Sequence, residues 1–240
     1  MPPRLFVDQP LRAGDSFNLP PGPARHVQVL RLQPGAALTL FNGEGGEWAA
    51  TVTQMGRSDV GVQLGARTEV DRELPLRVTL ALGMPANERM DALVEKATEL
   101  GVAAIQPLVC ERSVLRLSGE RAQKKVAHWL AVALSACEQS ARTRVPRVAE
   151  VRTLAQWLQA LPAASARWVL SLGDAQPVAA LVTPADALTC LSGPEGGLTP
   201  AEEAAARAAG FAPASLGARV LRADTAPLAL LAHLGLRDAR

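Results

Sequence analysis

Residues 188–230, LTCLSGPEGGLTPAEEAAARAAGFAPASLGARVLRADTAPLAL, decide the fold of this chain. A short apolar run opens the stretch and predicts a buried strand, and the glycine-rich SGPEGG follows it directly. Thr199, Pro200 and Glu202 then predict a helix start, because threonine caps, proline suits the first helical position, and glutamate three residues after the cap completes a capping box. Gly210 predicts the end of that helix. The succession of strand, glycine loop and helix indicates an α/β unit.

Two glycine loops in this stretch predict a binding pocket. Gly193, Gly196 and Gly197 let the backbone of the first loop approach a ligand closely. Gly217 opens the second loop, which carries two arginines, an acid and a hydroxyl before the apolar segment 226–236. Two such loops after consecutive strands are typical of a pocket built from backbone amides and carbonyls. For one glycine motif alone, a tightly packed strand-to-helix turn remains the alternative.

The pair of motifs GPEGG and LGxRxLRxxTA resembles the two cofactor loops of the SPOUT methyltransferases, and within that class the RsmE family. The resemblance extends from Arg4 to about Leu234. The other segments that carry it are 4–6, 26, 29–32, 41–43, 89–91, 95–102, 107–108, 111–114, 138–140 and 142–146. Ala223 and Asp224 depart from the family pattern, which usually has threonine and glutamate there, and Ala141 stands where glycine is common.

The resemblance implies the fold, the activity and the partners of the chain. The fold is α/β: a trefoil-knotted SPOUT methyltransferase domain, in which helices flank a parallel sheet, follows a small PUA-like β-barrel. The barrel would bind RNA and occupy residues 1–72, and the methyltransferase domain would occupy residues 73–240. The implied reaction moves a methyl group from S-adenosylmethionine to N3 of a uracil in 16S ribosomal RNA, position 1498 in the activity's usual name. The implied partners are this RNA, within a small-subunit particle, and a second copy of the chain.

Composition is compatible with a folded protein that has a sizeable core, at 48% hydrophobic and 20% charged residues. No stretch approaches the roughly 18 uninterrupted apolar residues of a membrane span, and MPPRLFVDQP lacks the apolar segment of a signal peptide. We therefore expect a cytoplasmic protein. The cysteines and histidines lack the spacing of a disulfide framework or a metal site, so no metal is expected. Neither GxGxxG nor a P-loop is present, so NAD and nucleoside triphosphates gain no support.

The pattern of secondary structure changes near residue 73. Residues 6–68 predict short strands with a hairpin at Asn42-Gly43, and a helix over 24–31 after the break at Pro20-Pro21-Gly22-Pro23. Beyond residue 76 strands alternate with helices, which favours a parallel sheet with helices on both faces. The predicted strands there are 76–82, 104–109 and 168–172, and the predicted helices are 89–100, 120–139, 155–161 and 226–236.

A methyl donor with a sulfonium and an adenine ring needs a shaped pocket, in which backbone groups read the adenine edge and apolar walls cover its faces. Three strand ends could supply such a pocket, and the resemblance implies that they hold S-adenosylmethionine. The cofactor-binding residues expected there are Leu172, Gly173, Gly193, Pro194, Glu195, Gly196, Gly197, Ser215, Leu216, Gly217 and Leu221.

Two residues are candidates for the chemistry. Transfer to N3 of uracil requires the imide to lose its proton, and a guanidinium near the flanking oxygens would stabilise the resulting charge. Arg222 directly follows the cofactor loop and is the first candidate, although it could instead pair with Asp224 or a backbone carbonyl. Glu195 could orient the ribose or assist proton removal, and capping of the following helix is equally compatible. No residue is identified as the general base.

Arginines provide the expected contacts to RNA. The net charge of +2 does not by itself indicate nucleic acid, and the scarcity of lysine among the 25 basic residues mostly reflects genome composition. Exposed arginines are solvated surface by default, so a patch is a firmer expectation than any single contact. The expected RNA-binding residues are Arg4, His26 and Arg31 on the barrel and Arg112, Arg142 and Arg144 on the catalytic domain.

Segment 226–236, APLALLAHLGL, is apolar nearly all round, which predicts a helix that is covered on every side. Burial within one subunit would satisfy this, and so would a homodimer in which Arg142 or Arg144 reaches the substrate of the other subunit. Two other functions remain open: a ribosome-assembly factor that binds S-adenosylmethionine without catalysis, and a ribose 2′-O-methyltransferase of the same class.

Overall fold

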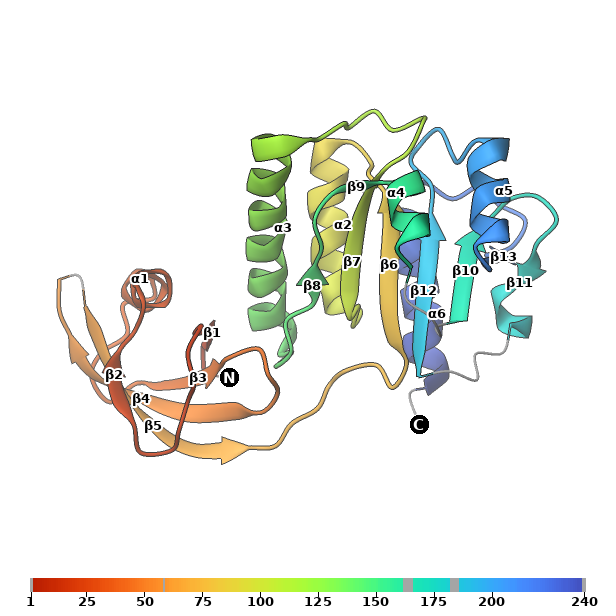
Figure 1. Cartoon of the computed structure of the whole chain (residues 1–240). Coiled ribbons are helices and arrows are strands. Elements are labelled where there is room, and N and C mark those ends of the chain that lie inside the picture. Colours follow the sequence, from red (N-terminus) through yellow and green to blue (C-terminus); the bar gives the residue numbers. More distant parts are fainter. Residues whose placement is uncertain (1, 58, 162–165, 182–185, 239–240) are drawn as a thin grey trace. The chain divides into compact units, whose positions relative to one another are not determined.

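The computed structural model describes residues 2–57, 59–161, 166–181 and 186–238. The chain divides into two compact units (Figure 1). Each unit has its own core of buried side chains. The first unit comprises residues 1–73 together with 137–145, and the second comprises residues 74–136 and 146–240. The chain therefore leaves the first unit after residue 73 and returns to it for nine residues.

The first unit is built on a five-stranded sheet with the order β1-β3-β4-β5-β2. Its strands are β1 (Arg4–Phe6), β2 (Ser16–Asn18), β3 (Ala37–Phe41), β4 (Glu47–Met55) and β5 (Val60–Thr68). All neighbours are antiparallel except β1 and β3, which are parallel. Side chains alternate along β4, where Trp48, Ala50 and Val52 are buried, so one face of the sheet covers the core of this unit.

Helix α1 (Pro21–Val29) begins earlier than the sequence suggested. The prolines were expected to break the chain before residue 24, but Pro21 and Pro23 lie in the first turn of the helix. Proline is tolerated there because the amide groups of the first turn have no partner within the helix. The helix also ends earlier than predicted, since Arg31 adopts a left-handed backbone with φ 52°.

The second unit contains a sheet in which every pair of neighbours is parallel, with the order β11-β13-β10-β12-β6-β7-β8, and β9 also pairs with β7. Its strands are β6 (Arg77–Gly83), β7 (Ala104–Val109), β8 (Arg147–Val148), β9 (Arg152–Thr153), β10 (Ala166–Leu170), β11 (Gln176–Pro177), β12 (Ala187–Ser192) and β13 (Ala212–Ser215). Its helices are α2 (Asn87–Glu99), α3 (Gly119–Ser140), α4 (Leu154–Gln159), α5 (Pro200–Ala208) and α6 (Thr225–Asp238), with the short 3-10 turn η1 (Val178–Ala180).

Helices cover both faces of this sheet. In β6, Val78, Leu80 and Leu82 share a core with residues of α2, α3 and α6, whereas Ala81 shares a second core with residues of α4 and α5. Figure 1 shows α4 in front of the sheet and α6 behind it. The predicted parallel sheet with helices on both faces is thus confirmed. The expected trefoil knot stays a prediction.

The elements around the glycine loops follow the sequence closely. Thr199 caps α5, its side chain accepts from the amide of Glu202, and the Glu202 side chain accepts from the amide of Thr199, so the predicted capping box is present. The apolar helix α6 buries Leu230, Leu231 and Leu234 in the core of its own unit. Within the described ranges, no helix is both long enough and apolar enough to cross a membrane.

Candidate active site

A pocket of about 610 Å³ lies at the carboxyl ends of β10, β12 and β13. In open parallel sheets, ligands bind beyond the carboxyl ends of the strands, because the loops that leave neighbouring strands meet there. All its lining residues belong to the second unit. They are Arg89, Arg112, Leu170, Ser171, Leu172, Gly173, Ser192, Gly193, Pro194, Glu195, Gly196, Gly197, Leu198, Glu203, Ala214, Leu216, Gly217, Arg219, Val220, Leu221, Arg222, Ala223 and Ala226.

The residues expected to bind the cofactor are nearly all brought together by this pocket. Those that line it are Leu172, Gly173, Gly193, Pro194, Glu195, Gly196, Gly197, Leu216, Gly217 and Leu221. Ser215 is not among the lining residues, and its hydroxyl instead accepts a hydrogen bond from the amide of Gly217 at 3.2 Å. Ser215 therefore shapes the second loop. The predicted strand 168–172 ends at Leu170, so Leu172 lies in the loop that follows.

Two glycines of the first loop have identifiable reasons to be glycine. Gly197 has φ +70°, a left-handed conformation that side chains rarely adopt, and its amide donates to the carbonyl of Pro194 at 2.8 Å. At Gly196, a Cβ would lie 2.9 Å from the Cβ of Arg112. One glycine thus permits the turn, and the other permits the close approach of a neighbouring loop.

That neighbouring loop follows β7 and braces the first glycine loop. Arg112 donates from Nη1 to the carbonyl oxygen of Gly196 at 3.0 Å. The amide of Glu111 donates to the carboxylate of Glu202 at 2.8 Å, which joins the same loop to the start of α5. Arg112 was expected to contact RNA, and the structure places it on the wall of the pocket.

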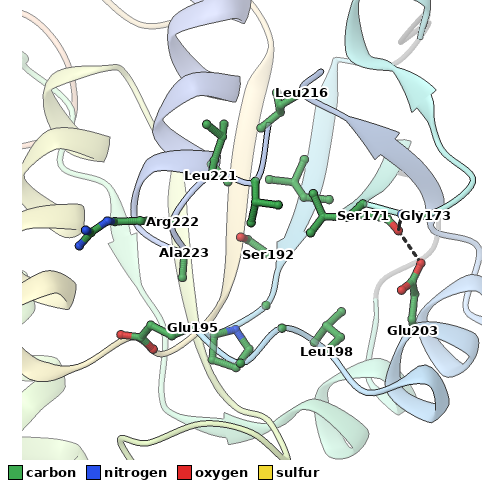
Figure 2. Close-up of a pocket in the computed structure, with 18 of the residues that line it drawn as sticks. Ser171, Gly173, Ser192, Glu195, Leu198, Glu203, Leu216, Leu221, Arg222 and Ala223 are labelled. Atoms are coloured by element: carbon green, nitrogen blue, oxygen red, sulfur yellow. Dashed lines mark hydrogen bonds between the residues drawn. The ribbon is translucent and has the colours of Figure 1, made fainter. Parts of the chain in front are cut away.

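The two candidate catalytic residues lie on the same side of the pocket in Figure 2. Arg222 is exposed, and within the part of the chain that the structure describes its side chain makes no ion pair, so the expected alternative of pairing with Asp224 is not observed. Glu195 accepts a hydrogen bond at Oε1 from the amide of Ala86 at 3.0 Å, and this oxygen lies 3.9 Å from Nη1 of Arg89. Glu195 therefore caps the start of α2. The alternative of a cap on α5 is wrong, because Thr199 fills that position.

The other side of the pocket carries a hydrogen-bonded group that the sequence did not indicate. Ser171 donates to the carboxylate of Glu203 at 2.7 Å, and Arg207 donates to the same oxygen at 2.9 Å (Figure 2 draws the first bond). The Arg207 guanidinium holds the pKa of Glu203 below its usual range, and Ser171 adds to this effect against partial burial. Arg89 also lines the pocket, although its segment, 89–91, was expected only to carry the family resemblance and not to contribute to the site.

Three of the expected RNA-binding residues are exposed on the first unit, which includes Arg144 although that residue was expected on the catalytic domain. Arg31 and Arg144 are exposed, and Arg144 forms a β-bridge with Glu44. His26 is also exposed, with Nδ1 3.9 Å from Oε2 of Glu138. These side chains are accessible to a partner.

Two other expected RNA contacts are held within the first unit instead: Arg142 is buried and Arg4 is partly buried. Arg142 is 3% exposed, and its guanidinium donates to both carboxylate oxygens of Glu73. Arg4 donates to Glu47 at 2.7 Å and to the carbonyl of Ala141 at 3.3 Å. The expectation that Arg142 faces RNA from an exposed loop is wrong, since it joins segment 137–145 to the rest of the first unit.

The cysteines are buried and take no part in the pocket. Burial raises the pKa of the Cys110 thiol to about 12 and that of Cys137 to about 11, and it raises the pKa of Cys190 as well. Thiols with raised pKa values are poor nucleophiles at neutral pH. Among the residues with a described position, no cluster of histidine, cysteine or acidic side chains could hold a metal ion.

Proteins of known sequence and structure are similar to this chain over most of its length. The ribosomal RNA small subunit methyltransferase E of Synechocystis is 35% identical over 86% of this chain and 68% of its own length, and that of Bacillus subtilis is 31% identical over 96% and 95%. The crystal structure of the Neisseria gonorrhoeae enzyme of that name, bound to S-adenosyl methionine, matches with a TM-score of 0.93 and 35% identity over 99% of this chain and 98% of its own. A methyltransferase from Legionella pneumophila, in complex with the same cofactor, matches with a TM-score of 0.94 and 32% identity over the same shares.

Two family descriptions account for both units. Residues 24–64 match the RNA methyltransferase PUA domain, and residues 72–235 match the RNA methyltransferase domain. The second match covers more than half of the chain. With its fold, its pocket and these relatives, the chain belongs to the ribosomal RNA small subunit methyltransferase E family.

Proposed function

We propose that this protein transfers a methyl group from S-adenosylmethionine to N3 of a uridine in 16S ribosomal RNA, position 1498 in the usual name of the activity. One observation carries the proposal: two glycine loops and a third strand end form one pocket with an exposed arginine at its rim. Relatives with 35% and 32% identity were solved with this cofactor. An RNA substrate of this kind also favours the cytoplasm as the place of action.

The pocket fits a ligand of the size and character of the methyl donor. Its volume falls within the range typical of small-molecule sites. Leu170, Leu198, Leu216 and Leu221 supply apolar walls, which suit the faces of an adenine ring. The first glycine loop, from Gly193 to Gly197, brings the backbone close to the space that the ligand would fill. Bound there, the donor would supply an electrophilic methyl group.

Arg222 is the residue that we propose acts on the uracil, which is the nucleophile. Removal of the N3 proton leaves negative charge on the uracil oxygens, and a guanidinium placed in advance beside them lowers the energy of the transition state. Arg222 is suited to this role because no carboxylate in the described chain holds it. Glu195 is held by the amide of Ala86, so it orients Arg89 at this end of the pocket rather than acting as a mobile base. The general base stays unassigned.

We assign RNA contacts to the exposed His26, Arg31 and Arg144. Arg4 and Arg142 are not assigned to RNA, because carboxylates of the first unit hold them. Guanidinium groups recognise phosphates without regard to sequence, so Arg31 and Arg144 would position the RNA and not select the base, and His26 would add a hydrogen bond. Arg112 could add a contact from the rim of the pocket. The proposed substrate is 16S ribosomal RNA within a small-subunit particle.

We also propose a homodimer and a knotted second unit. The dimer is supported by the sequence of α6, which is apolar nearly all round although Leu236 on this helix is 78% exposed. The knot rests on the family to which the chain belongs, and in the sheet β12 lies between β6 and β10.

The test uses the purified protein with S-adenosylmethionine labelled on the methyl group. We expect label to enter small-subunit ribosomal RNA and not large-subunit RNA. Binding of the cofactor without transfer to either RNA or to small-subunit particles would contradict the proposal and favour a non-catalytic assembly factor. Label on a ribose oxygen would favour the 2′-O-methyltransferase alternative.

A further inference from the structure

The loop after β10 forms one wall of the pocket but has little apolar packing. Ser171, Leu172 and Gly173 all line the pocket. Leu172 is 72% exposed, and a Cβ at Gly173 would have only the Ser171 hydroxyl within 4 Å, at 3.6 Å. A loop without buried side chains is held in one conformation only if hydrogen bonds hold it.

Such hydrogen bonds converge on Glu203 of α5. Ser171 Oγ accepts from the amide of Gly173 at 3.1 Å and donates to Glu203 Oε1 at 2.7 Å, so this hydroxyl connects the loop to the helix (Figure 2). Arg207, one turn further along α5, donates to Glu203 Oε1 at 2.9 Å and to the carbonyl of Asp174 at 3.4 Å. The loop is therefore attached to α5 at both of its ends.

We propose that Glu203 is a positioning residue for the methyl donor: through Ser171 and Arg207, its carboxylate holds the loop 171–174 in the shape that binds this ligand. The inference rests on the proposed function, because it takes S-adenosylmethionine as the ligand. It assigns a role to a residue outside both glycine motifs. It also explains why Glu203, which lines the pocket, directs its carboxylate to Ser171 and Arg207.

The role differs from that of an ordinary helix pair. Glu203 and Arg207 have the i, i+4 spacing of an exposed pair, which contributes little to stability by itself. The bond from Ser171 has a different consequence, because it orders backbone that the ligand must contact. A loop ordered in advance costs the ligand less entropy on binding. Loss of Glu203 should therefore weaken binding more than it weakens folding.

The test measures S-adenosylmethionine binding by calorimetry for the full chain and for Glu203→Ala, Glu203→Gln, Ser171→Ala and the double variant Ser171→Ala, Glu203→Ala. We expect about tenfold weaker binding for Glu203→Ala and for Ser171→Ala, the effect typical of losing a hydrogen bond to a charged group. The double variant should be no weaker than the single ones, because both remove the same connection. Glu203→Gln should retain most of the affinity, since its amide oxygen can still accept from Ser171.

Turnover and a matched pair provide the controls. In steady-state turnover, Glu203→Ala should raise the KM for S-adenosylmethionine by about the same factor as it weakens binding, with a smaller change in kcat, since the residue acts on binding. Glu120→Ala removes an equivalent i, i+4 pair with Lys124 on α3, outside the pocket, and should leave binding unchanged.

Two results would overturn the inference alone: wild-type affinity in Glu203→Ala while the unmodified protein binds the donor, or single losses that add fully in the double variant. If the unmodified protein does not bind S-adenosylmethionine, the proposed function fails together with the inference.

Discussion

Gly197 shows how a single backbone conformation controls the first glycine loop. Its φ of +70° is strained for any residue with a Cβ, and most strained for a β-branched one. We expect Gly197→Val to abolish S-adenosylmethionine binding in calorimetry while the first unit stays folded. Gly35→Val is the matched control, because Gly35 also has a positive φ, with open space around it, but lies in the first unit. Unchanged affinity in Gly197→Val would remove this loop from the cofactor site.

Arg222 tests the chemistry at the rim of the pocket. If its guanidinium stabilises the uracil anion, Arg222→Ala should lower the single-turnover rate by about 10²–10³, the loss typical of removing one preorganised donor. The affinity for S-adenosylmethionine should change little, because the side chain is exposed and points away from Leu216 and Ser171 on the far wall of the pocket (Figure 2). A variant with a normal single-turnover rate would exclude Arg222 from the mechanism.

Arg142 is expected to matter for folding. Its buried guanidinium is paired with Glu73, so Arg142→Ala would leave a partly buried carboxylate without its partner. Breaking a buried pair in this way costs about 3 kcal/mol. Denaturant unfolding should show this loss, whereas Arg144→Ala, at an exposed position two residues away, should cost less than about 1 kcal/mol. Equal stability of the two variants would contradict the structural role of Arg142.

Residue types alone could not separate these two arginines. Both lie in the segment RTRVP, and both were expected on exposed loops. What separates them is Glu73, which is 69 positions away in the sequence. The same holds for Ser171 and Glu203, which lie 32 positions apart and meet only because β10 and α5 are neighbours in the fold. Contacts of this kind are not visible in local patterns.

At the scale of elements, the end of α3 offers a test by pH. Burial raises the pKa of Glu138, although the amide of Phe6 and the nearby His26 act in the opposite direction. The ionised form is therefore disfavoured in the folded state, and stability is lost as the pH rises from the unfolded pKa through the raised folded pKa. Glu138→Gln keeps an acceptor for Phe6 and removes the charge.

We expect Glu138→Gln to raise the thermal unfolding midpoint at pH 7.5 relative to the wild type. The difference should shrink as the pH falls below the raised pKa, because the wild-type side chain is then protonated and neutral as well. His26→Gln, measured in parallel, removes the side chain near Glu138 and so separates its contribution from that of burial. If the difference between the two unfolding midpoints grew toward low pH, burial could not be the dominant cause of the raised pKa of Glu138.

Elements with strong local signals were predicted almost to the residue. The capping box at Thr199 and the glycine at 210 delimit α5 because their bonds are all local. Helix α1 was misplaced because a proline cluster indicates a break and a helix start equally well. The two-residue strands β8, β9 and β11 have no periodicity to detect, since pairing partners alone define them.

At the scale of the whole molecule, the proposed homodimer can be tested by its mass in solution and by mixing variants. We expect a dimer by analytical ultracentrifugation at micromolar concentration. Mixing Arg222→Ala with Arg144→Ala protein should restore some activity, if Arg144 of one subunit serves the substrate of the other and heterodimers hold one intact site. A monomer would reject the dimer, and a dimer without restored activity would reject the shared site.

The alternation of strands and helices after residue 76 predicted the parallel sheet, because a parallel strand pair needs a crossover connection. The return of segment 137–145 to the first unit was not predicted. That segment includes the last turn of a continuous helix, so nothing in its local pattern marks a boundary. Its attachment depends on distant partners such as Glu73 and Val70.

The central claim is methyl transfer to N3 of a uridine in 16S ribosomal RNA, and mass spectrometry of that RNA from cells with and without this gene tests it most directly. The account predicts one N3-methyluridine that is present with the gene, absent without it, and restored by the purified protein with S-adenosylmethionine. RNA with the same methylation in both kinds of cell, or a gene-dependent methyl group on a ribose oxygen, would contradict it.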